Sequence, residues 1–170
     1  MRAALFIVAV AASIWAGGAT ATRQMASPCT GGDLRGAFAA VVGSEGAGNI
    51  VYALRLRNVS TSACTVTGLP QVQLLSAKGT TLPTHAVAAH PGELTAVLVT
   101  LAPNKAAVST ARFSPDVPGT GEQQIGRCEP VSSKLRVTPS GHGSVVVPIV
   151  PPTSVCEHGG MTFSVFTAAH

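Results

Sequence analysis

The sequence predicts an all-β fold: an antiparallel, immunoglobulin-like β-sandwich of about eight or nine short strands, stapled by disulfides. Short alternating or apolar segments recur at close intervals between turn-forming Gly, Pro and Asn residues, which is typical of sandwiches and barrels. No segment after the first 21 residues has a convincing helical period. The four cysteines, an even number, indicate two disulfides if the chain is exported.

The first 21 residues have the pattern of a secretory signal peptide. Arg2 precedes an uncharged run, Ala3–Ala16, and Ala19-Thr20-Ala21 fits the small-x-small pattern of a cleavage site. The run is shorter than the ~20 residues that a membrane-spanning helix needs, so we expect secretion or release to the cell envelope without stable membrane insertion after cleavage. Residues 22–28 are expected to form a flexible lead and residues 29–170 a single domain.

Composition argues against nucleic-acid binding and against stacking on sugars. Only 11% of residues are charged, against about 25% in typical domains, and the longest basic cluster is Arg55 and Arg57. A nucleic-acid-binding protein would present a basic stripe. The only Trp, Trp15, lies in the predicted signal peptide, so few aromatic side chains are left for stacking.

The clearest strand is 50–58. Its even positions, Ile50 to Leu56, are apolar, and its odd positions include Arg55 and Arg57, so the even set is expected to face the core. It forms a hairpin with 33–42 through a Gly-rich turn. The other expected strands are 71–75, an edge strand at 82–89 that contains Pro83, a hairpin of 94–101 with 106–113, a hairpin of 133–138 with 144–149, and a final strand at 162–168.

Hairpin register selects among the three possible cysteine pairings. In the first hairpin the numbers of opposed residues sum to about 92, which places Cys29 beside Cys64. In the hairpin near the C-terminus they sum to about 282 or 283, which places Cys128 beside Cys156. We therefore predict Cys29–Cys64 and Cys128–Cys156. The main competitor joins Cys64 to Cys128 and Cys29 to Cys156.

Several of these segments together resemble the exported actinobacterial proteins that carry domain of unknown function 4232. The resemblance covers about residues 29–165, and Asn104 stands where the family usually has Gly. It implies export and a β-sandwich, and it implies no catalytic residues because the family has no established activity. It rests on the four ordered cysteines, the 49–58 strand, the motif Cys64-Thr65-Val66-Thr67-Gly68-Leu69-Pro70, Val72, Leu74, Leu101-Ala102-Pro103, Cys128-Glu129-Pro130 and Leu135-Arg136-Val137.

Catalytic and metal-binding patterns are sparse. No G-x-S-x-G motif occurs, and the four cysteines pair, so we expect no enzymatic activity and no cofactor. We also expect no metal site, because the sequence has no H-x-H and no Met-rich run. The weak candidates for ligands are His158, Met161 and His170, since exported β-sandwich copper carriers use His and Met. His85 and His90 lie five apart in a predicted loop. The sequon Asn58-Val59-Ser60 is interpreted as a polar turn.

The function predicted from these features is a monomeric binding or structural module of the cell envelope or extracellular space. Its partner would be an unidentified protein or envelope polymer, contacted through the loops at 43–49, 85–93 and 114–124. The alternative is an extracytoplasmic carrier of a metal such as copper.

Overall fold

The computed structural model describes residues 25–92 and 97–169. The predicted signal peptide lies outside these residues. The described chain is almost entirely β, and within it no helix is long and apolar enough to cross a membrane. The elements are η1 (Gly31–Asp33), β1 (Leu34–Ala40), β2 (Ile50–Asn58), β3 (Cys64–Thr67), β4 (Gln71–Leu75), β5 (His85–Ala88), β6 (Leu98–Leu101), β7 (Ala106–Phe113), β8 (Ser132–Thr138), β9 (Val145–Thr153), α1 (Cys156–Gly159), β10 (Gly160–Phe163) and β11 (Thr167–Ala168).

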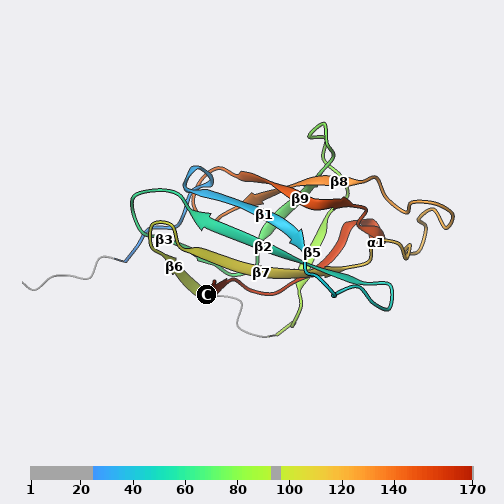
Figure 1. Cartoon of the computed structure of the whole chain (residues 1–170), viewed down its shortest axis with the longest axis horizontal. Helices are drawn as coiled ribbons and strands as arrows, with labels where there is room; N and C mark the ends of the chain where they lie inside the picture. Colours follow the sequence, from blue (N-terminus) through green and yellow to red (C-terminus); the bar gives the residue numbers. More distant parts are fainter. Residues whose placement is uncertain (1–24, 93–96, 170) are drawn as a thin grey trace, which may run out of the picture.

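The strands form one large mixed sheet and one small sheet, which corrects the expectation of an antiparallel immunoglobulin-like sandwich. The large sheet has the order β4-β8-β9-β1-β2-β7-β10-β5, with β11 also paired to β7, and β3 pairs with β6 separately. Two of its neighbour pairs, β1 with β9 and β10 with β5, are parallel. The sheet curls until it is nearly barrel-shaped (Figure 1), and β4 and β5 are its two edges.

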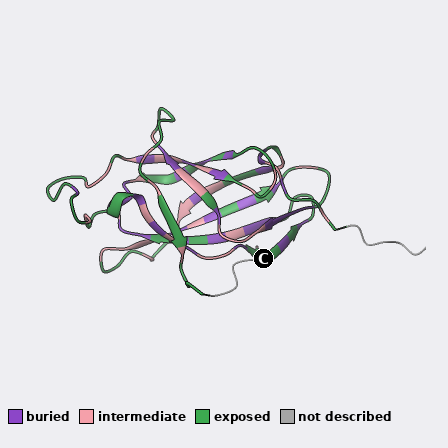
Figure 2. Cartoon of the chain, turned by 180° about the vertical axis from the view of Figure 1, so that it is seen from behind, coloured by how far each residue is buried: buried purple, intermediate pink, exposed green. Residues whose placement is uncertain are grey.

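The predicted first hairpin is confirmed. Strands β1 and β2 pair from Leu34 with Asn58 to Ala40 with Tyr52, so opposed numbers sum to 92 throughout. Leu54 and Leu56 are fully buried, while Arg55 between them is exposed. Alternation of buried and exposed positions is visible along the strands in Figure 2, because successive side chains of a strand point to opposite faces.

The predicted hairpin of 94–101 with 106–113 is wrong for the residues that the structure describes; residues 94–96 lie outside them. Strand β6 pairs with β3 in the small sheet, whereas β7 lies between β2 and β10 in the large one. The turn that separates them contains Asn104 at φ 66°, a conformation that Asn tolerates better than most residues. The Asn104 N–H donates to the carbonyl of Asn58 at 2.9 Å, and the Asn58 N–H donates to Lys105 at 2.9 Å. The turn is therefore hydrogen-bonded to the end of β2. It carries the chain from β6 in the small sheet to β7 in the large one.

The final predicted strand differs from expectation, whereas the predicted edge strand and the second hairpin are confirmed. The final strand 162–168 is divided into β10 and β11, and both pair with β7. The segment expected at 82–89 is the edge strand β5, paired in parallel with β10. The β8–β9 hairpin has the predicted register, with Val137 opposite Val145, and is shifted by an irregularity between Ser132 and Lys134.

The core is aliphatic with one aromatic cluster. Phe38 lies 5.1 Å from Tyr52 and 6.1 Å from Phe163 between ring centroids, and Tyr52 lies 5.2 Å from Phe113. Aromatic pairs at such distances contribute about 0.5–1.5 kcal/mol beyond their buried area. The Tyr52 hydroxyl donates to the carbonyl of Pro151 at 2.9 Å, so its polar end is satisfied inside the core.

The two disulfides join the pairs expected from the sequence. The Cα atoms of Cys29 and Cys64 are 4.8 Å apart, and those of Cys128 and Cys156 are 5.5 Å apart. Cys29 and Cys64 do not meet by continuation of the β1–β2 hairpin, because η1 separates Cys29 from the start of β1. The segment before it instead runs parallel to β3, and the Thr65 N–H donates to Ser27 at 2.9 Å.

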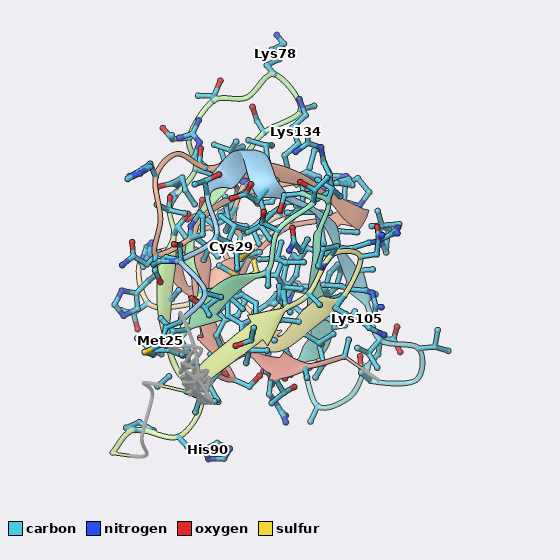
Figure 3. The ribbon with its side chains drawn as sticks, turned by 90° about the vertical axis from the view of Figure 1, so that its left-hand side faces the viewer. Met25, Cys29, Lys78, His90, Lys105 and Lys134 are labelled. Atoms are coloured by element: carbon cyan, nitrogen blue, oxygen red, sulfur yellow. A yellow bond between two sulfur atoms is a disulfide. The ribbon has the colours of Figure 1, made fainter. Side chains whose placement is uncertain are left out.

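The contact at Ser27 also corrects the expected flexible lead, since its last residues are hydrogen-bonded to the domain. Figure 3 shows Cys29 inside the molecule and Lys78 projecting from the tip of the β4–β5 connection.

Candidate functional site

The segment α1 is a left-handed turn and not a regular helix. Glu157 has φ 55° and ψ 44°, His158 has φ 56° and ψ 38°, and Gly159 has φ 78°. Left-handed conformations cost roughly 1–2 kcal/mol for each residue that carries a Cβ. Two such residues in succession therefore require compensating contacts, which the segment before β8 supplies.

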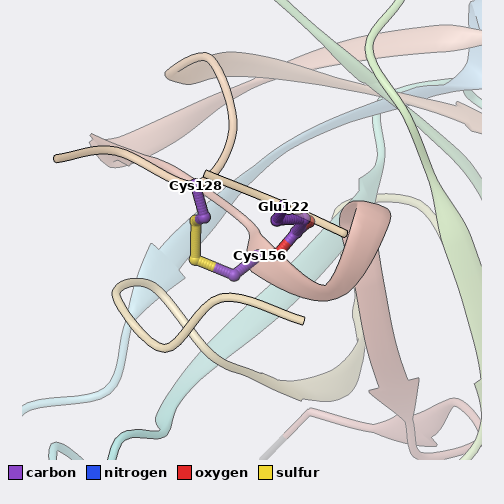
Figure 4. A group of neighbouring side chains, drawn as sticks. All are labelled: Glu122, Cys128 and Cys156. Carbon is purple, nitrogen blue, oxygen red and sulfur yellow. A yellow bond between two sulfur atoms is a disulfide. The ribbon is translucent and has the colours of Figure 1, made fainter. Parts of the chain in front are cut away.

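The compensating group is the carboxylate of Glu122, whose side chain is 1% exposed. Its oxygens accept the backbone N–H of Gly119 at 2.6 Å, that of Glu157 at 2.9 Å, and that of His158. The Cys128–Cys156 disulfide lies beside it (Figure 4). Successive N–H groups of a turn form a concave anion site, and here a side chain of the same chain fills it.

Two further titratable groups face this carboxylate. His158 Nδ1 lies 3.7 Å from a carboxylate oxygen of Glu122 and 3.7 Å from one of Glu129. The other ring nitrogen of His158 lies 3.1 Å from the Thr120 carbonyl oxygen. The cluster is asymmetric in exposure, because the His158 side chain is 61% exposed and that of Glu129 is 15% exposed.

The two carboxyl groups have pKa values shifted in opposite directions. Burial raises the pKa of Glu122, but the N–H groups of His158, Gly119 and Glu157 outweigh it and lower the pKa below its ordinary value. Burial and the charge of Glu122 raise the pKa of Glu129, against the opposing effect of His158. Glu122 is therefore held ionised, and Glu129 is the group of the pair that protonates first.

One atom each of Glu122, Glu129 and His158 lies within 4.8 Å of the others, so these three could approach one cation. Glu122 already accepts three backbone N–H groups, which leaves it limited capacity to bind a metal. The cysteines beside it are joined in a disulfide and offer no thiolate. The first role of the cluster is thus to hold the 114–131 segment on the left-handed turn.

The three candidate metal ligands named from the sequence are placed in different surroundings. His158 belongs to the cluster just described, Met161 is 2% exposed in the hydrophobic core, and His170 lies outside the described residues. His85 is on β5 and His90 is on the turn after it. Sequence reasoning missed both glutamates; the one available signal was the position of Glu129 next to Cys128.

The three predicted contact loops lie partly together. The 43–49 loop joins β1 to β2, and Gly48 packs so close to Val117 of the 114–124 loop that a Cβ would come within 2.6 Å of its side chain. The predicted 85–93 loop begins as β5. Asn49 and His85 line a hollow of about 380 Å³, together with Arg112 and Glu157.

A larger pocket, of about 640 Å³, opens between the two edge strands of the large sheet. We call it the seam pocket; its walls include Val72 of β4 and Ala86 of β5, and its lining includes Leu56, Val66 and Phe166. No lining residue has an ionisable side chain. The polar groups that could bind a ligand are the backbone and four side chains of the lining, those of Thr67, Gln71, Thr138 and Ser140.

The seam pocket exists because β4 and β5 diverge. The connection between them first folds back on β4: the Leu82 N–H donates to Leu74 at 2.9 Å, and the Leu74 N–H donates to the Thr84 hydroxyl at 2.9 Å. Beyond Thr84 the chain leaves β4 and pairs with β10 instead. The two strands therefore form a wedge that is closed at Thr84 and widens toward Val72. At its far end the Phe166 N–H donates to the Gly68 carbonyl at 3.4 Å.

Burial along β5 shows that the wedge exposes the inner face of the sheet. Ala86 is paired with Met161, which is 2% exposed, so both side chains point to the inner face. Ala86 is nevertheless exposed to solvent. A strand beside β5 would cover it, and among the described residues none lies there.

Comparison with known proteins identifies a family without an assigned activity. No curated protein and no solved structure matches the chain significantly. The family described as Domain of unknown function (DUF4232) matches residues 29–167, which contain all four cysteines, the left-handed turn and the seam pocket. The chain therefore belongs to the Domain of unknown function (DUF4232) family.

Proposed function

We propose that this protein is an exported, monomeric binding module of the cell envelope or extracellular space, without catalytic activity, and that the seam pocket is its ligand site. Two disulfides support an oxidising, extracytoplasmic location. The leader-like first 21 residues support export. The partner remains a protein or an envelope polymer, now contacted at the seam in preference to the three loops.

The observation that carries this proposal is the exposure of Ala86 on the inner face of β5, within a pocket of about 640 Å³. Ligand pockets commonly have volumes of about 300–1,000 Å³, an apolar lining and a few polar groups. Because the lining has no ionisable side chain, the bound group should be uncharged. A charged group would lose hydration there without gaining an ion pair.

Fluorescence of N-phenyl-1-naphthylamine, a neutral apolar probe, tests this site on the purified exported protein. The wild type should enhance the emission, and Ala86→Trp, which fills the wedge from an exposed position, should weaken binding at least tenfold. The matched control is Val146→Trp, at a 48% exposed position of β9 outside the pocket. Absence of binding to the wild type, or equal binding by both variants, would overturn the proposal.

The second candidate function is carriage of a metal ion, favoured only by the convergence of Glu122, Glu129 and His158. Two carboxylates and an imidazole suit Zn²⁺ better than Cu(I), which prefers thiolate and thioether ligands. Titration with Cu(I), Cu(II) and Zn(II) decides between the two functions. A submicromolar site that is lost in His158→Ala, but kept in a control His90→Ala, would favour the carrier.

A further inference from the structure

We propose that the seam pocket takes an extended, uncharged peptide segment of another protein, which adds as a strand between β4 and β5. This inference rests on the proposed function of the seam pocket and specifies its ligand class. It is carried by the backbone groups on the two walls of the wedge, which are positioned for strand pairing.

The β4 wall presents the backbone of Val72. On the side away from β8, Leu74 accepts from Leu82, and Ser76 donates to Thr80 at 2.9 Å. Backbone groups of alternate residues point to the same side of a strand, so the N–H and C=O of Val72 also point away from β8, into the wedge. No hydrogen bond joins them to any residue in the described part of the chain on that side.

The β5 wall presents the backbone of Ala86 and Ala88. The Ala89 N–H donates to Phe163 at 2.8 Å, which continues the parallel ladder between β5 and β10. In a parallel ladder alternate residues direct both backbone groups to the partner strand. Ala89 and Val87 therefore face β10, and Ala86 and Ala88 direct their N–H and C=O groups into the wedge.

An inserted strand would satisfy both walls at once. Its backbone would pair with Val72 on one side and with Ala86 on the other, and the nearly closed barrel would close. Side chains at alternate positions of the peptide would point to Leu56 and Phe166, two buried residues of the lining, and the intervening ones to solvent. Strand addition of this kind takes affinity from main-chain hydrogen bonds and specificity from alternate side chains.

The ligand must also be short and uncharged. Strand β5 has only four residues, and the wedge closes where Leu74 and Thr84 are hydrogen-bonded. The absence of ionisable side chains in the lining disfavours Lys, Arg, Asp and Glu at the buried positions of the peptide. An extended segment with small or branched apolar residues at alternate positions fits both limits.

A phage-displayed library of random heptapeptides tests this proposal. Clones that bind the Ala86→Trp variant are removed first, and the remaining clones are selected for binding to the exported wild-type protein. Uncharged peptides should be enriched. Synthetic copies of an enriched peptide are then each methylated at one backbone nitrogen. Methylation at alternate positions should weaken binding at least tenfold, and methylation at the positions between them should change the affinity little. Methylation removes a donor and leaves the side chains intact, so this pattern distinguishes strand pairing from side-chain recognition.

A second variant tests the protein side. Ala86→Pro removes an N–H that faces the wedge while leaving the β10 ladder intact, so it should weaken the peptide at least tenfold while the melting temperature stays close to that of the wild type. Peptide affinity that survives Ala86→Pro, tolerance of methylation at every position, or enrichment of no peptide despite probe binding would each overturn strand addition alone. If the wild type bound neither the probe nor any peptide, the proposed function would be overturned as well.

Discussion

The buried carboxylate of Glu122 accepts the backbone N–H of Glu157 at 2.9 Å, across 35 residues of chain. The same carboxylate accepts two further N–H groups, so one side chain stabilises a turn whose residues are individually strained. The disulfide beside it covalently joins the two segments that the carboxylate brings together.

We predict that Glu122→Gln lowers the free energy of unfolding at pH 7 by about 1–3 kcal/mol, because an amide accepts fewer N–H groups and carries no charge. Urea denaturation measures the change, with the exposed Glu45→Gln as control. The pKa of Glu122 is lowered in the folded state, so its contribution is complete above the unfolded pKa of about 4.3 and is lost as pH falls through the folded value. A pH-independent difference would contradict this account.

Glu129→Gln should have the opposite sign. The pKa of Glu129 is raised in the folded state, by burial and then by the charge of Glu122. A raised pKa means that stability is fully present below the unfolded value of about 4.3 and declines as pH rises through the folded one. The variant should thus be as stable as the wild type near pH 4 and more stable at pH 7. Lower stability at pH 7 would show that the Glu129 carboxylate is needed as an acceptor.

Gly159→Ala should destabilise the protein by at least about 2 kcal/mol. The residue has φ 78°, and an added Cβ would lie 2.0 Å from the carbonyl oxygen of Pro83, which cannot move without shifting the start of β5. Gly43→Ala is the matched control, because it has φ 75° with no other atom within 4 Å of the Cβ position. It should cost about 1 kcal/mol, so comparable thermal unfolding of the two variants would be inconsistent with close packing at Pro83.

Asn58→Ala should cost about 3 kcal/mol in unfolding free energy. Asn58 is fully buried, and its amide donates to the carbonyls of Ser62 at 2.8 Å and Leu101 at 2.9 Å. The second bond connects the end of β2 to β6 in the other sheet, and its loss would leave the buried Leu101 carbonyl without this donor. Asn49→Ala, which removes one 3.2 Å contact in an exposed loop, should change stability by less than about 0.5 kcal/mol. Equal urea midpoints for the two variants would refute this role.

Replacement of Cys128 and Cys156 by Ser should lower stability by about 3.5 kcal/mol, as expected from closing a loop across 28 residues. The Cys29 and Cys64 double variant, with a separation of 35, should lose a similar amount. Only the first variant should also increase proteolysis within residues 114–131, because that segment is held by this bridge and by Glu122. Equal protease sensitivity in both variants would argue against a joint role.

Much of the fold could be predicted from local sequence pattern. The alternation in 50–58 predicted which residues of β2 are buried, and the short turn before it predicted the β1–β2 register residue by residue. The same reasoning predicted the β8–β9 register and the Cys128–Cys156 pair. These features depend on a period of two and on short loops, which are properties of neighbouring residues.

Pairings between distant strands depended on tertiary structure. Nothing in the alternation of 98–101 and 106–113 indicates that β6 joins β3 while β7 joins β2, because a half-buried strand has the same pattern whichever neighbour it has. The parallel pairs are equally non-local. For the same reason the sequence predicted most of the strands, but it missed β3 and assigned the others to an antiparallel sandwich.

The sequence by itself determined the β character of the chain, the two local hairpins and the Cys128–Cys156 pair, which left Cys29 and Cys64 for the second bridge. Tertiary structure decided that β4 and β5 diverge at Thr84, which creates the seam pocket, and that Glu122 meets the N–H groups of Glu157 and His158. Both features are made of backbone groups left unpaired by local structure. Such groups exist in every strand edge and turn, and only the arrangement of distant segments decides which of them find a partner.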